Sequence, residues 1–505
     1  MSQFQSSNVK YLAAARTHDT LDMLSPVLAN LRQAEEGFIA YDQHLNKMVF
    51  VQAVLHCCTG DNPMEDALAM ITGSSSCREC DGNLASSMVG KQRLESETIA
   101  TYNSAKNEHE IMSKYGVAKH ATPLFVVLSV RFHKDLAVDF LHLFSLGLEK
   151  RIVAETAASL NSKPLQDAFI KLVNAFDFES AGLQRYSGVR VLKYHGSFQG
   201  HDFKAVAQFL PFVLLELVEQ HVEPAHQATA TALLQAMIKL SKVGARLWRV
   251  SMQRDKIPAL RQEVIDTVES LYDLNPGYRK TQKAHMAVHI VDSIEYLGTP
   301  RSLCTEMTEA ENKNIRKHIV ARSNHHNPSR DLAAYYGIKL SYDLMLGGAL
   351  WSPSGERIGY GTALRAFLDD NRDALRTTTP AAAAAQANVN KPGRPRYKID
   401  HGGYRAIIAQ NGDKVHLGQA FVCNQAPYIL KQVGDMGVKA VKLVKQNTHA
   451  LTNLPLYQID TNEVTMSLAS VERFTSVVKY NNGPRNDDRQ LYFLNIFYFD
   501  HYLPR

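Results

Sequence analysis

The first element predicted by the pattern of apolar positions is a helix near the start of the chain. Leu21, Leu24, Leu28 and Leu31 recur at helical spacing, which predicts an amphipathic helix from about Thr20 to Ala34. Met23 and Val27 belong to the same apolar pattern.

Two strands are predicted directly after this helix. The run GFIAYDQHLNKMVFVQAVLHCC has two apolar stretches around a polar turn at Asp42–Lys47. The second stretch, Met48–Cys58, is nearly all apolar, which is typical of a strand covered on both faces. We therefore expect Asp61 at the end of a buried strand, a common position for a reactive carboxylate.

The region from about 95 to 345 is predicted to be mainly helical. Apolar residues follow a helical period in 123–149, 151–177, 203–219, 224–252, 258–273 and 283–297. A short strand pair is expected at 188–198. The most apolar run, Ala205–Val218, is shorter than the roughly 20 residues that span a bilayer, so we expect a buried helix and no membrane span.

The character of the sequence changes after residue 377. Thr377–Lys391 is an Ala-rich, low-complexity stretch that indicates a linker. Residues 397–505 are rich in β-branched and aromatic residues in alternating or apolar runs, which predicts a small β-rich module. The expected fold class is α+β and mainly helical.

Composition excludes several classes of protein. Among 505 residues, 45% are hydrophobic and 21% are charged, which excludes a disordered or collagen-like chain. The net charge of +6 permits nucleic-acid binding without indicating it. Six cysteines are too few for a disulfide scaffold and indicate a reducing compartment. The N-terminal residues lack the basic flank and apolar run of a signal peptide.

Two sets of residues could bind a metal ion. Cys77 and Cys80 form a C-x2-C motif that could supply half of a tetrahedral zinc site, and Asp61 could bind a divalent cation. His285 and His289, four residues apart on a predicted helix, could grip one metal ion or one phosphate. The alternatives are a pair of reduced, partly buried cysteines and a structural histidine pair.

A carboxylate and an imidazole are also expected to meet in the predicted helical region. Asp139 and His142 are three residues apart, so they share one face of a helix. The alternative is an ordinary polar pair on a mostly buried helix.

Charged residues gather near residue 310 and in the linker. Glu306, Glu309 and Glu311 precede cations that could contact phosphates, although the pattern also fits a solvated helix. These cations are Lys313, Arg316, Lys317, Arg322 and Arg330. The linker sequence KPGRPR resembles an AT-hook, in which Arg394 and Arg396 would enter the minor groove of A·T-rich DNA. Pro392 replaces the usual Arg, and a plain basic linker is the alternative.

Several blocks of sequence, in order, resemble the transposases of fungal CACTA (En/Spm-type) transposons. The resemblance covers about residues 5–340 and lies in these blocks: GDNPMEDALAMITGSSSCRECDGN, GKQRLESETIATYNSAKNEHEIMSKYGV, LAVDFLHLFSLGLEKRIV, YHGSFQGHDFKAVAQFLPFVLLELV and KAHMAVHIVDSIEYLGTPRSLCTEMTEAENKNIRKHIVARSNHHNPSRDLA. Such proteins are similar to RNase H-like DDE enzymes, in which three carboxylates hold two divalent metals for DNA strand transfer.

The resemblance implies roles for several residues. Asp61 matches the second catalytic aspartate, Asp139 and His142 match a D-x2-H signature, and Glu309 matches the final glutamate, with Glu306 as the alternative. We expect carboxyl oxygens of Asp61 and Glu309 within roughly 5–8 Å of each other. We also expect Cys77 and Cys80 to face histidines, either His285 and His289 or His142, around zinc.

The resemblance also implies a division of the chain. The parts are a partial RNase H-like core with the C-x2-C motif (1–95), a helical insertion (96–300), core helices with the final Glu (301–376), the linker (377–396) and the β-rich module (397–505). No aspartate in residues 1–60 fits the family's first catalytic position, which suggests N-terminal truncation. Losing one carboxylate unbalances a two-metal site, so we expect little or no strand transfer.

Three functions follow from these observations. The first is a nuclear, transposon-derived DNA-binding protein without catalysis. The second is an active transposase subunit that uses Mg²⁺, and the third is a host-adopted nucleic-acid or protein interaction module. The expected partners are DNA, as transposon ends or non-specifically, and a second copy of the chain or another transposon-encoded protein.

Overall fold

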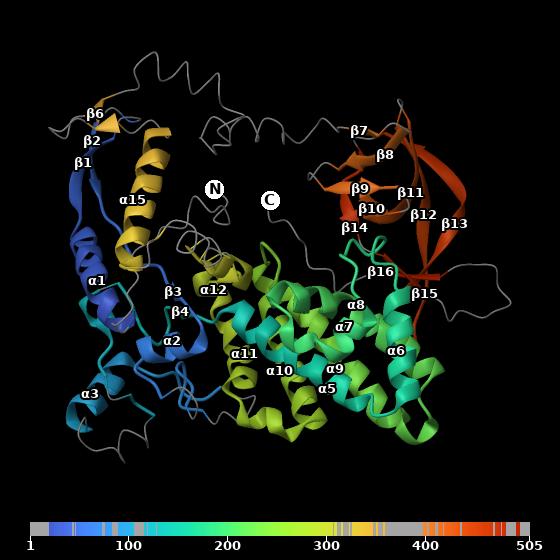
Figure 1. Cartoon of the computed structure of the whole chain (residues 1–505), viewed down its shortest axis with the longest axis horizontal. Helices are drawn as coiled ribbons and strands as arrows, with labels where there is room; N and C mark the ends of the chain where they lie inside the picture. The colour runs from blue at the N-terminus through green and yellow to red at the C-terminus, as the bar shows by residue number, and fades with distance from the viewer. Residues whose placement is uncertain are drawn as a thin grey trace. The chain divides into compact units, whose positions relative to one another are not determined.

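Figure 1 shows the computed structural model of the whole chain. The structure describes residues 20–42, 45, 47–72, 76–82, 89–105, 116–118, 120–127, 129–306, 308–310, 315–316, 323, 326–346, 350–351, 357–358, 397–400, 403–409, 413–417, 419–434, 437–467, 470–475, 477–480 and 491–494. The chain divides into two units. The first unit comprises Met1–Ala53, Glu306–Pro392 and Leu503–Arg505, and the second unit comprises Val54–Thr305 and Gly393–Tyr502.

The first unit contains the predicted N-terminal helix and hairpin. Helix α1 spans Thr20–Glu36, and strands β1 (Phe38–Asp42) and β2 (Lys47–Val51) pair antiparallel, which confirms both predictions. Gly37, at a φ of +83°, joins the helix to the hairpin in a conformation that favours glycine. The other described elements of this unit are α15 (Pro328–Leu346), β5 (Leu350–Trp351) and β6 (Arg357–Ile358).

The predicted buried strand Met48–Cys58 is wrong. The strand ends at Val51 because the next two residues bond to the end of α1: Gln52 Nε2 donates to Glu35 O at 2.6 Å and Ala53 N donates to Ala34 O at 3.0 Å. The side chain of Phe50 is 64% exposed rather than covered. A second strand, β3, begins at Cys58 and ends at Thr59.

Helices predominate in the second unit before its β-rich part, and they make up most of residues 95–305, as predicted. They are α2 (Asn62–Leu68), α3 (Glu95–Ala105), α5 (Lys150–Ser159), α6 (Lys163–Ala175), α7 (Gly188–Lys193), α8 (Gly200–Gln220), α9 (Gln227–Leu247), α10 (Ile257–Leu274), α11 (Gln282–Asp292), α12 (Ile294–Leu297) and α13 (Pro300–Leu303). A π-helix, Leu141–Glu149, precedes α5. Short 3₁₀ turns are η2 (Pro123–Val126), η4 (His195–Ser197), η5 (Pro224–His226), η6 (Arg254–Lys256) and η7 (Pro276–Lys280).

Two predictions in the helical region need correction. The stretch 123–149 is not one helix. The 3₁₀ turn η2 and the π-helix Leu141–Glu149 lie at its two ends, and β4 (Leu136–Ala137), which pairs parallel with β3, lies between them. The predicted strand pair at 188–198 is a helix and a 3₁₀ turn. Gly188 packs so closely on α6 that a Cβ atom there would lie 2.6 Å from the Ile170 backbone, and Gly188 N donates to Asn174 Oδ1. This contact with α6 favours a helical turn despite the β-branched residues.

Helix α8 is the centre of the hydrophobic core of the second unit. The run Ala205–Val218 lies within it and is buried at nearly every position, as predicted. The ring of Phe209 contacts the rings of Phe176, Phe178 and Tyr186 at centroid distances of 5.6, 5.1 and 5.8 Å. Among the described residues, no helix combines the length and apolar content required to cross a membrane.

The C-terminal module is β-rich, as predicted. A seven-stranded antiparallel sheet has the order β14-β10-β11-β12-β13-β16-β15, and a three-stranded sheet has the order β7-β8-β9. Their strands are β7 (Tyr397–Asp400), β8 (Gly403–Ile408), β9 (Lys414–His416), β10 (Ala420–Cys423), β11 (Ala426–Gly434), β12 (Gly437–Thr448), β13 (Pro455–Met466), β14 (Arg473–Thr475), β15 (Val477–Tyr480) and β16 (Leu491–Leu494). The whole is a mainly helical α+β protein, which confirms the predicted class.

Truncation of the central aromatic side chain should destabilise the second unit strongly. We expect Phe209→Ala to lower the free energy of unfolding by about 3–5 kcal/mol, because it removes a buried ring and leaves a cavity. Denaturant unfolding followed by circular dichroism measures the change. The control is Phe125→Ala, because that ring is 41% exposed; equal losses in both variants would contradict the central place of Phe209.

Candidate metal centre

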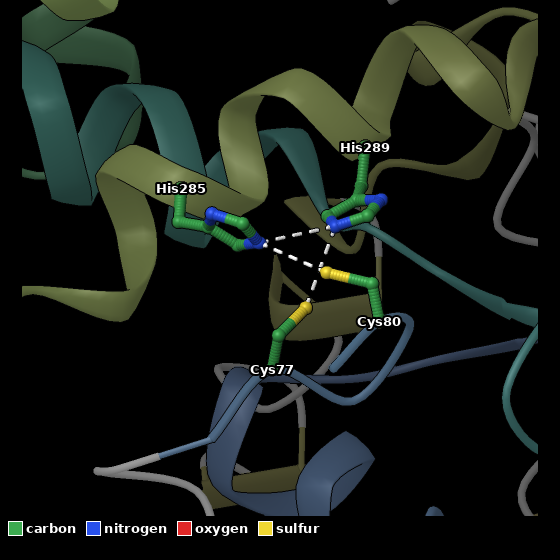
Figure 2. Close-up of side chains that lie close together, drawn as sticks. All are labelled: Cys77, Cys80, His285 and His289. Carbon is green, nitrogen blue, oxygen red and sulfur yellow. Dashed lines mark hydrogen bonds between the residues drawn. The ribbon is translucent and has the colours of Figure 1, made fainter. Parts of the chain in front are cut away.

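Four buried side chains converge in the second unit from two segments far apart in sequence. Cys77 and Cys80 lie on the loop that follows α2, and His285 and His289 lie one turn apart on α11 (Figure 2). One ligand atom from each residue lies within 4.8 Å of all the others. The cysteines are not joined in a disulfide.

The distances fit a tetrahedral zinc ion. His285 Nε2 lies 3.3 Å from Cys80 Sγ and 3.3 Å from His289 Nε2, and the latter atom lies 3.4 Å from Cys77 Sγ. Zinc bonds of about 2.0 Å to nitrogen and about 2.3 Å to sulfur place the ligands of a tetrahedron about 3.3–3.8 Å apart. The cluster could therefore hold a metal ion such as zinc, with all four positions supplied by the protein.

Backbone groups hold the C-x2-C loop in the shape that the cluster needs. The N–H groups of Glu79 and Gly82 donate to the sulfur atoms of Cys77 and Cys80, each at 3.4 Å. Arg93 Nε donates to the carbonyl oxygens of the same two cysteines, at 2.7 and 3.1 Å. N–H donors at sulfur favour the thiolate, which is the form that binds metal.

The loop returns so closely on itself that two glycines are required. Asp81 N donates to Lys91 O at 3.0 Å, which brings the backbones of Gly82 and Gly90 together. A Cβ atom at Gly90 would lie 2.3 Å from the nitrogen of Gly82. No other residue fits at this crossing without moving the loop.

Two carboxylates orient the ring of His289 through its Nδ1 atom. Its Nδ1 atom lies 3.4 Å from Glu79 Oε2 and 3.4 Å from Asp292 Oδ2. A proton on Nδ1, held between these carboxylates, leaves the lone pair of Nε2 facing the thiols. Such outer carboxylates are the usual partners of metal-bound histidines.

The thiols of Cys77 and Cys80 affect each other's ionisation. Hydrogen bonding to Cys80, and then burial, raise the pKa of the Cys77 thiol. The same bond from Cys77 lowers the pKa of Cys80. Binding of a metal ion would release any proton that the two thiols carry, because metal binds the thiolate form.

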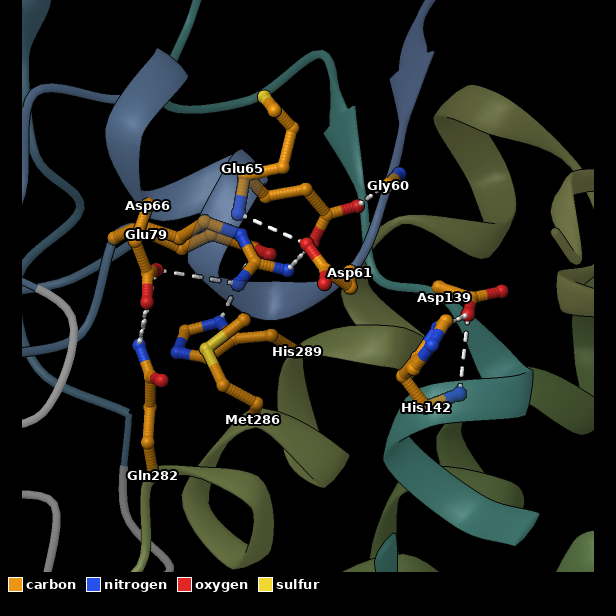
Figure 3. Close-up of polar contacts among 12 residues, drawn as sticks. Gly60, Asp61, Glu65, Asp66, Glu79, Asp139, His142, Gln282, Met286 and His289 are labelled. Carbon is orange, nitrogen blue, oxygen red and sulfur yellow. Dashed lines mark hydrogen bonds and ion pairs between the residues drawn. The ribbon is translucent and has the colours of Figure 1, made fainter. Parts of the chain in front are cut away.

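Arg78, one of the two residues between the cysteines, anchors the loop to α2. Arg78 is fully buried and forms ion pairs with Glu65 and, at 3.5 Å, with Asp66. Figure 3 labels both acidic residues. Burial raises the pKa of Glu65, and Arg78 offsets part of that rise. From α11, Gln282 donates to Asp66 Oδ1 at 3.1 Å and to Ser76 O at 3.2 Å.

Asp61 and Asp139 follow the two parallel strands at the same register. Cys58 pairs with Leu136 and Thr59 pairs with Ala137, so each aspartate comes two residues after a paired strand end (Figure 3). Asp61 Oδ1 accepts a hydrogen bond from Met64 N at 3.0 Å and caps α2.

Asp139 is buried and fully engaged in hydrogen bonds. It accepts from His142 Nδ1 at 2.6 Å and His142 N at 3.0 Å, and from Thr305 Oγ1 at 2.8 Å and Thr305 N at 2.9 Å. Although burial acts in the opposite direction, these bonds lower the pKa of Asp139. The expected contact of carboxylate and imidazole is confirmed, but Asp139 precedes the π-helix rather than lying within a helix.

The other predicted site residues are not among the four residues of the cluster. His142 pairs with Asp139 and is not among the four ligand residues. Glu306 and Glu309 belong to the first unit and Asp61 to the second, so a shared metal ion stays a prediction. Arg316 and Arg330 are exposed. The predicted sites Lys313, Lys317, Arg322, Arg394 and Arg396 lie outside the described residues.

Several residues of the centre were not found from the sequence. Arg78 stands inside the C-x2-C motif, and its position there was the only available signal. Arg93 and Gln282 carry no motif. Thr305 lies 166 residues from Asp139, and nothing in the sequence connects the two.

No protein-family model matches the chain, and no curated protein matches it. The role of the centre is therefore inferred from the chemistry of its own side chains. Two thiols and two imidazoles in a closed, buried shell are typical of structural zinc, because a catalytic zinc ion keeps one position open for water or substrate.

Removing one ligand should abolish metal binding. We expect the purified protein to contain about one zinc ion per chain and Cys77→Ser to contain almost none. At free zinc about 1,000-fold above Kd, binding stabilises the fold by about 4 kcal/mol, or roughly 10 °C in melting temperature. Elemental analysis and melting with a chelator measure both effects. Cys57→Ser, a cysteine outside the cluster, is the matched control. Parent protein without zinc, and unchanged melting after chelation, would contradict the assignment.

Neutralising Asp139 should destabilise the protein in a pH-dependent way. Because its pKa is lowered in the folded state, the carboxylate stabilises the fold above its unfolded pKa of about 3.9, and this contribution is lost as the pH falls through the folded value. We expect Asp139→Asn to cost about 2–4 kcal/mol at pH 7 and less below about pH 4. Urea unfolding across this range measures it. The exposed Asp167→Asn should show little change, and a pH-independent loss at Asp139 would contradict the argument.

Proposed function

We propose that this protein is a transposase-like DNA-binding protein, stabilised by a structural zinc ion, that binds DNA without cutting it. One observation carries the proposal: a closed Cys2His2 cluster joins the loop after Asp61 to α11, with a long helical region between them. His285 is 205 residues from Cys80. Such a connection suits an RNase H-like core interrupted by a helical insertion, which is the organisation implied by the family resemblance.

The carboxylates at the strand ends support binding without catalysis. The oxygens of Asp139 accept four hydrogen bonds, and Asp61 caps α2. A catalytic Mg²⁺ requires carboxylate oxygens that are free to coordinate it. The zinc ion would have no open position, so it would contribute to stability rather than to reaction chemistry.

The cations identified in the sequence remain the first candidates for DNA contacts. Arg316 and Arg330 are exposed, which suits contacts to phosphates. Lys313, Lys317 and Arg322 would lie near them along the chain, and Arg394 would enter a minor groove. A nuclear location and assembly with a second copy, or with another transposon-encoded protein, belong to this proposal.

The matched register of Asp61 and Asp139 favours a second candidate, an active subunit that uses Mg²⁺. In that case both carboxylates would have to release their present partners to bind metal. A plasmid-nicking assay with Mg²⁺ separates the two functions. An active enzyme would nick the plasmid and its Asp61→Ala variant would not, whereas a protein that only binds DNA would nick it in neither form.

DNA binding should weaken steeply as salt rises. We expect the parent protein to shift mixed-sequence duplexes, with affinity falling as cations release counterions, and to nick no plasmid. Arg316→Ala should reduce the salt slope by about 1, whereas Arg394→Ala should weaken binding mainly to A·T-rich duplexes. Lys171→Ala, an exposed lysine on α6, serves as the control. Failure to bind duplex DNA at about 50 mM salt would contradict the proposal.

A further inference from the structure

We propose that Lys150, Arg151 and Lys283 form a phosphate-binding site that holds the backbone of bound DNA beside the strand ends of Asp61 and Asp139. The inference rests on the proposed function and adds a contact surface to it. All of these residues belong to the second unit.

Lys283 is fixed in place by the segment that follows Asp139. Its Nζ atom donates to the carbonyl oxygen of His142 at 2.8 Å, and His142 itself binds Asp139. Its side chain crosses the π-helix at Gly147, where a Cβ atom would lie 2.9 Å from His142 O and 3.0 Å from Lys283 Cδ. His142 therefore links the ammonium group of Lys283 to the carboxylate of Asp139.

The other two cations come from the junction of the π-helix and α5. Lys150 is exposed and Arg151 is half-exposed. The Arg151 guanidinium lies 5.8 Å from the centre of the Tyr278 ring, in the turn just before α11. This contact brings the start of α5 next to the segment that leads to Lys283.

The three cations influence one another. After burial, Arg151 and Lys150 are the strongest influences that lower the pKa of Lys283, whereas Asp139 and Asp61 act in the opposite direction. Within the described part of the chain, no salt bridge neutralises any of the three cations. Adjacent like charges repel, so a bound anion would stabilise this arrangement.

A phosphodiester group fits the site better than an isolated carboxylate would. Three cations on two helix starts can contact successive phosphates of one strand, and charge contacts of this kind position DNA without reading its sequence. The bound DNA strand would then run beside the ends of β3 and β4, where Asp61 and Asp139 lie. Free phosphate offers the same chemistry, so the test must separate the two sources.

The test compares two triple variants that carry the same change in net charge. One is Lys150→Gln with Arg151→Gln and Lys283→Gln. The other, on exposed lysines elsewhere in the second unit, is Lys171→Gln with Lys239→Gln and Lys256→Gln. We expect the first to reduce the slope of log affinity against log salt by roughly 2–3 and to weaken duplex binding at least about tenfold. The second should bind as the parent does. Lys150→Arg with Lys283→Arg, which keeps both charges, should retain binding.

Folding and free phosphate are controlled separately. Circular dichroism checks each variant, and if the Lys283 change prevents folding, the double variant at Lys150 and Arg151 should still lower the slope by roughly 2. Equal slopes in both triple variants would overturn the inference while the proposed function stands. Competition by millimolar inorganic phosphate without any effect of the variants on duplex binding would identify a small-anion site and also overturn it. A parent protein that binds no DNA would refute the proposed function itself.

Discussion

The contact on which the second unit depends most is the convergence of two cysteines and two histidines across more than 200 residues of chain. Strands β3 and β4 share only two residue pairs, which is too short a ladder to hold the two segments together by itself. Closing so long a loop costs conformational entropy, and a metal ion bound at the closure would offset that cost through four bonds. With a metal ion bound, the cluster would hold the two segments together, as a longer sheet does in other α+β proteins.

Each residue of the C-R-E-C sequence contributes to this junction in a different direction. The cysteines face α11, Arg78 reaches α2, and Glu79 supports His289 from behind. The buried charge of Arg78 is tolerated because the carboxyl groups of Glu65 and Asp66 pair with it. Loss of either sign would leave an unpaired charge in the interior, which typically costs about 3–5 kcal/mol.

Much of the helical region and the ligand set could be predicted from the sequence. Helices α8, α9 and α10 carry long apolar periods, and C-x2-C and H-x3-H are compact motifs with few interpretations. The predictions are wrong where contacts between residues distant in sequence determine the local structure. An apolar run such as Met48–Cys58 does not specify its neighbours, and Gln52 bonded to Glu35 instead of extending the strand. Val189 and Val191 favour a strand locally, but Gly188 against α6 makes a helix. The bonds from Thr305 to Asp139 depend on tertiary structure alone.

The π-helix Leu141–Glu149 has a geometric consequence for the groups at its two ends. Its wider winding takes up more residues per turn than an α-helix does, so it affects the angle between Asp139, which precedes it, and Lys150, which follows it. Each residue of an α-helix turns the chain by about 100°. Deleting one residue between Phe144 and Gly147, so that the segment winds as an α-helix, would rotate the cations away from the carboxylate while every side chain involved stayed the same. The alignment of the two charged groups is therefore encoded in the length of this segment as much as in its chemistry.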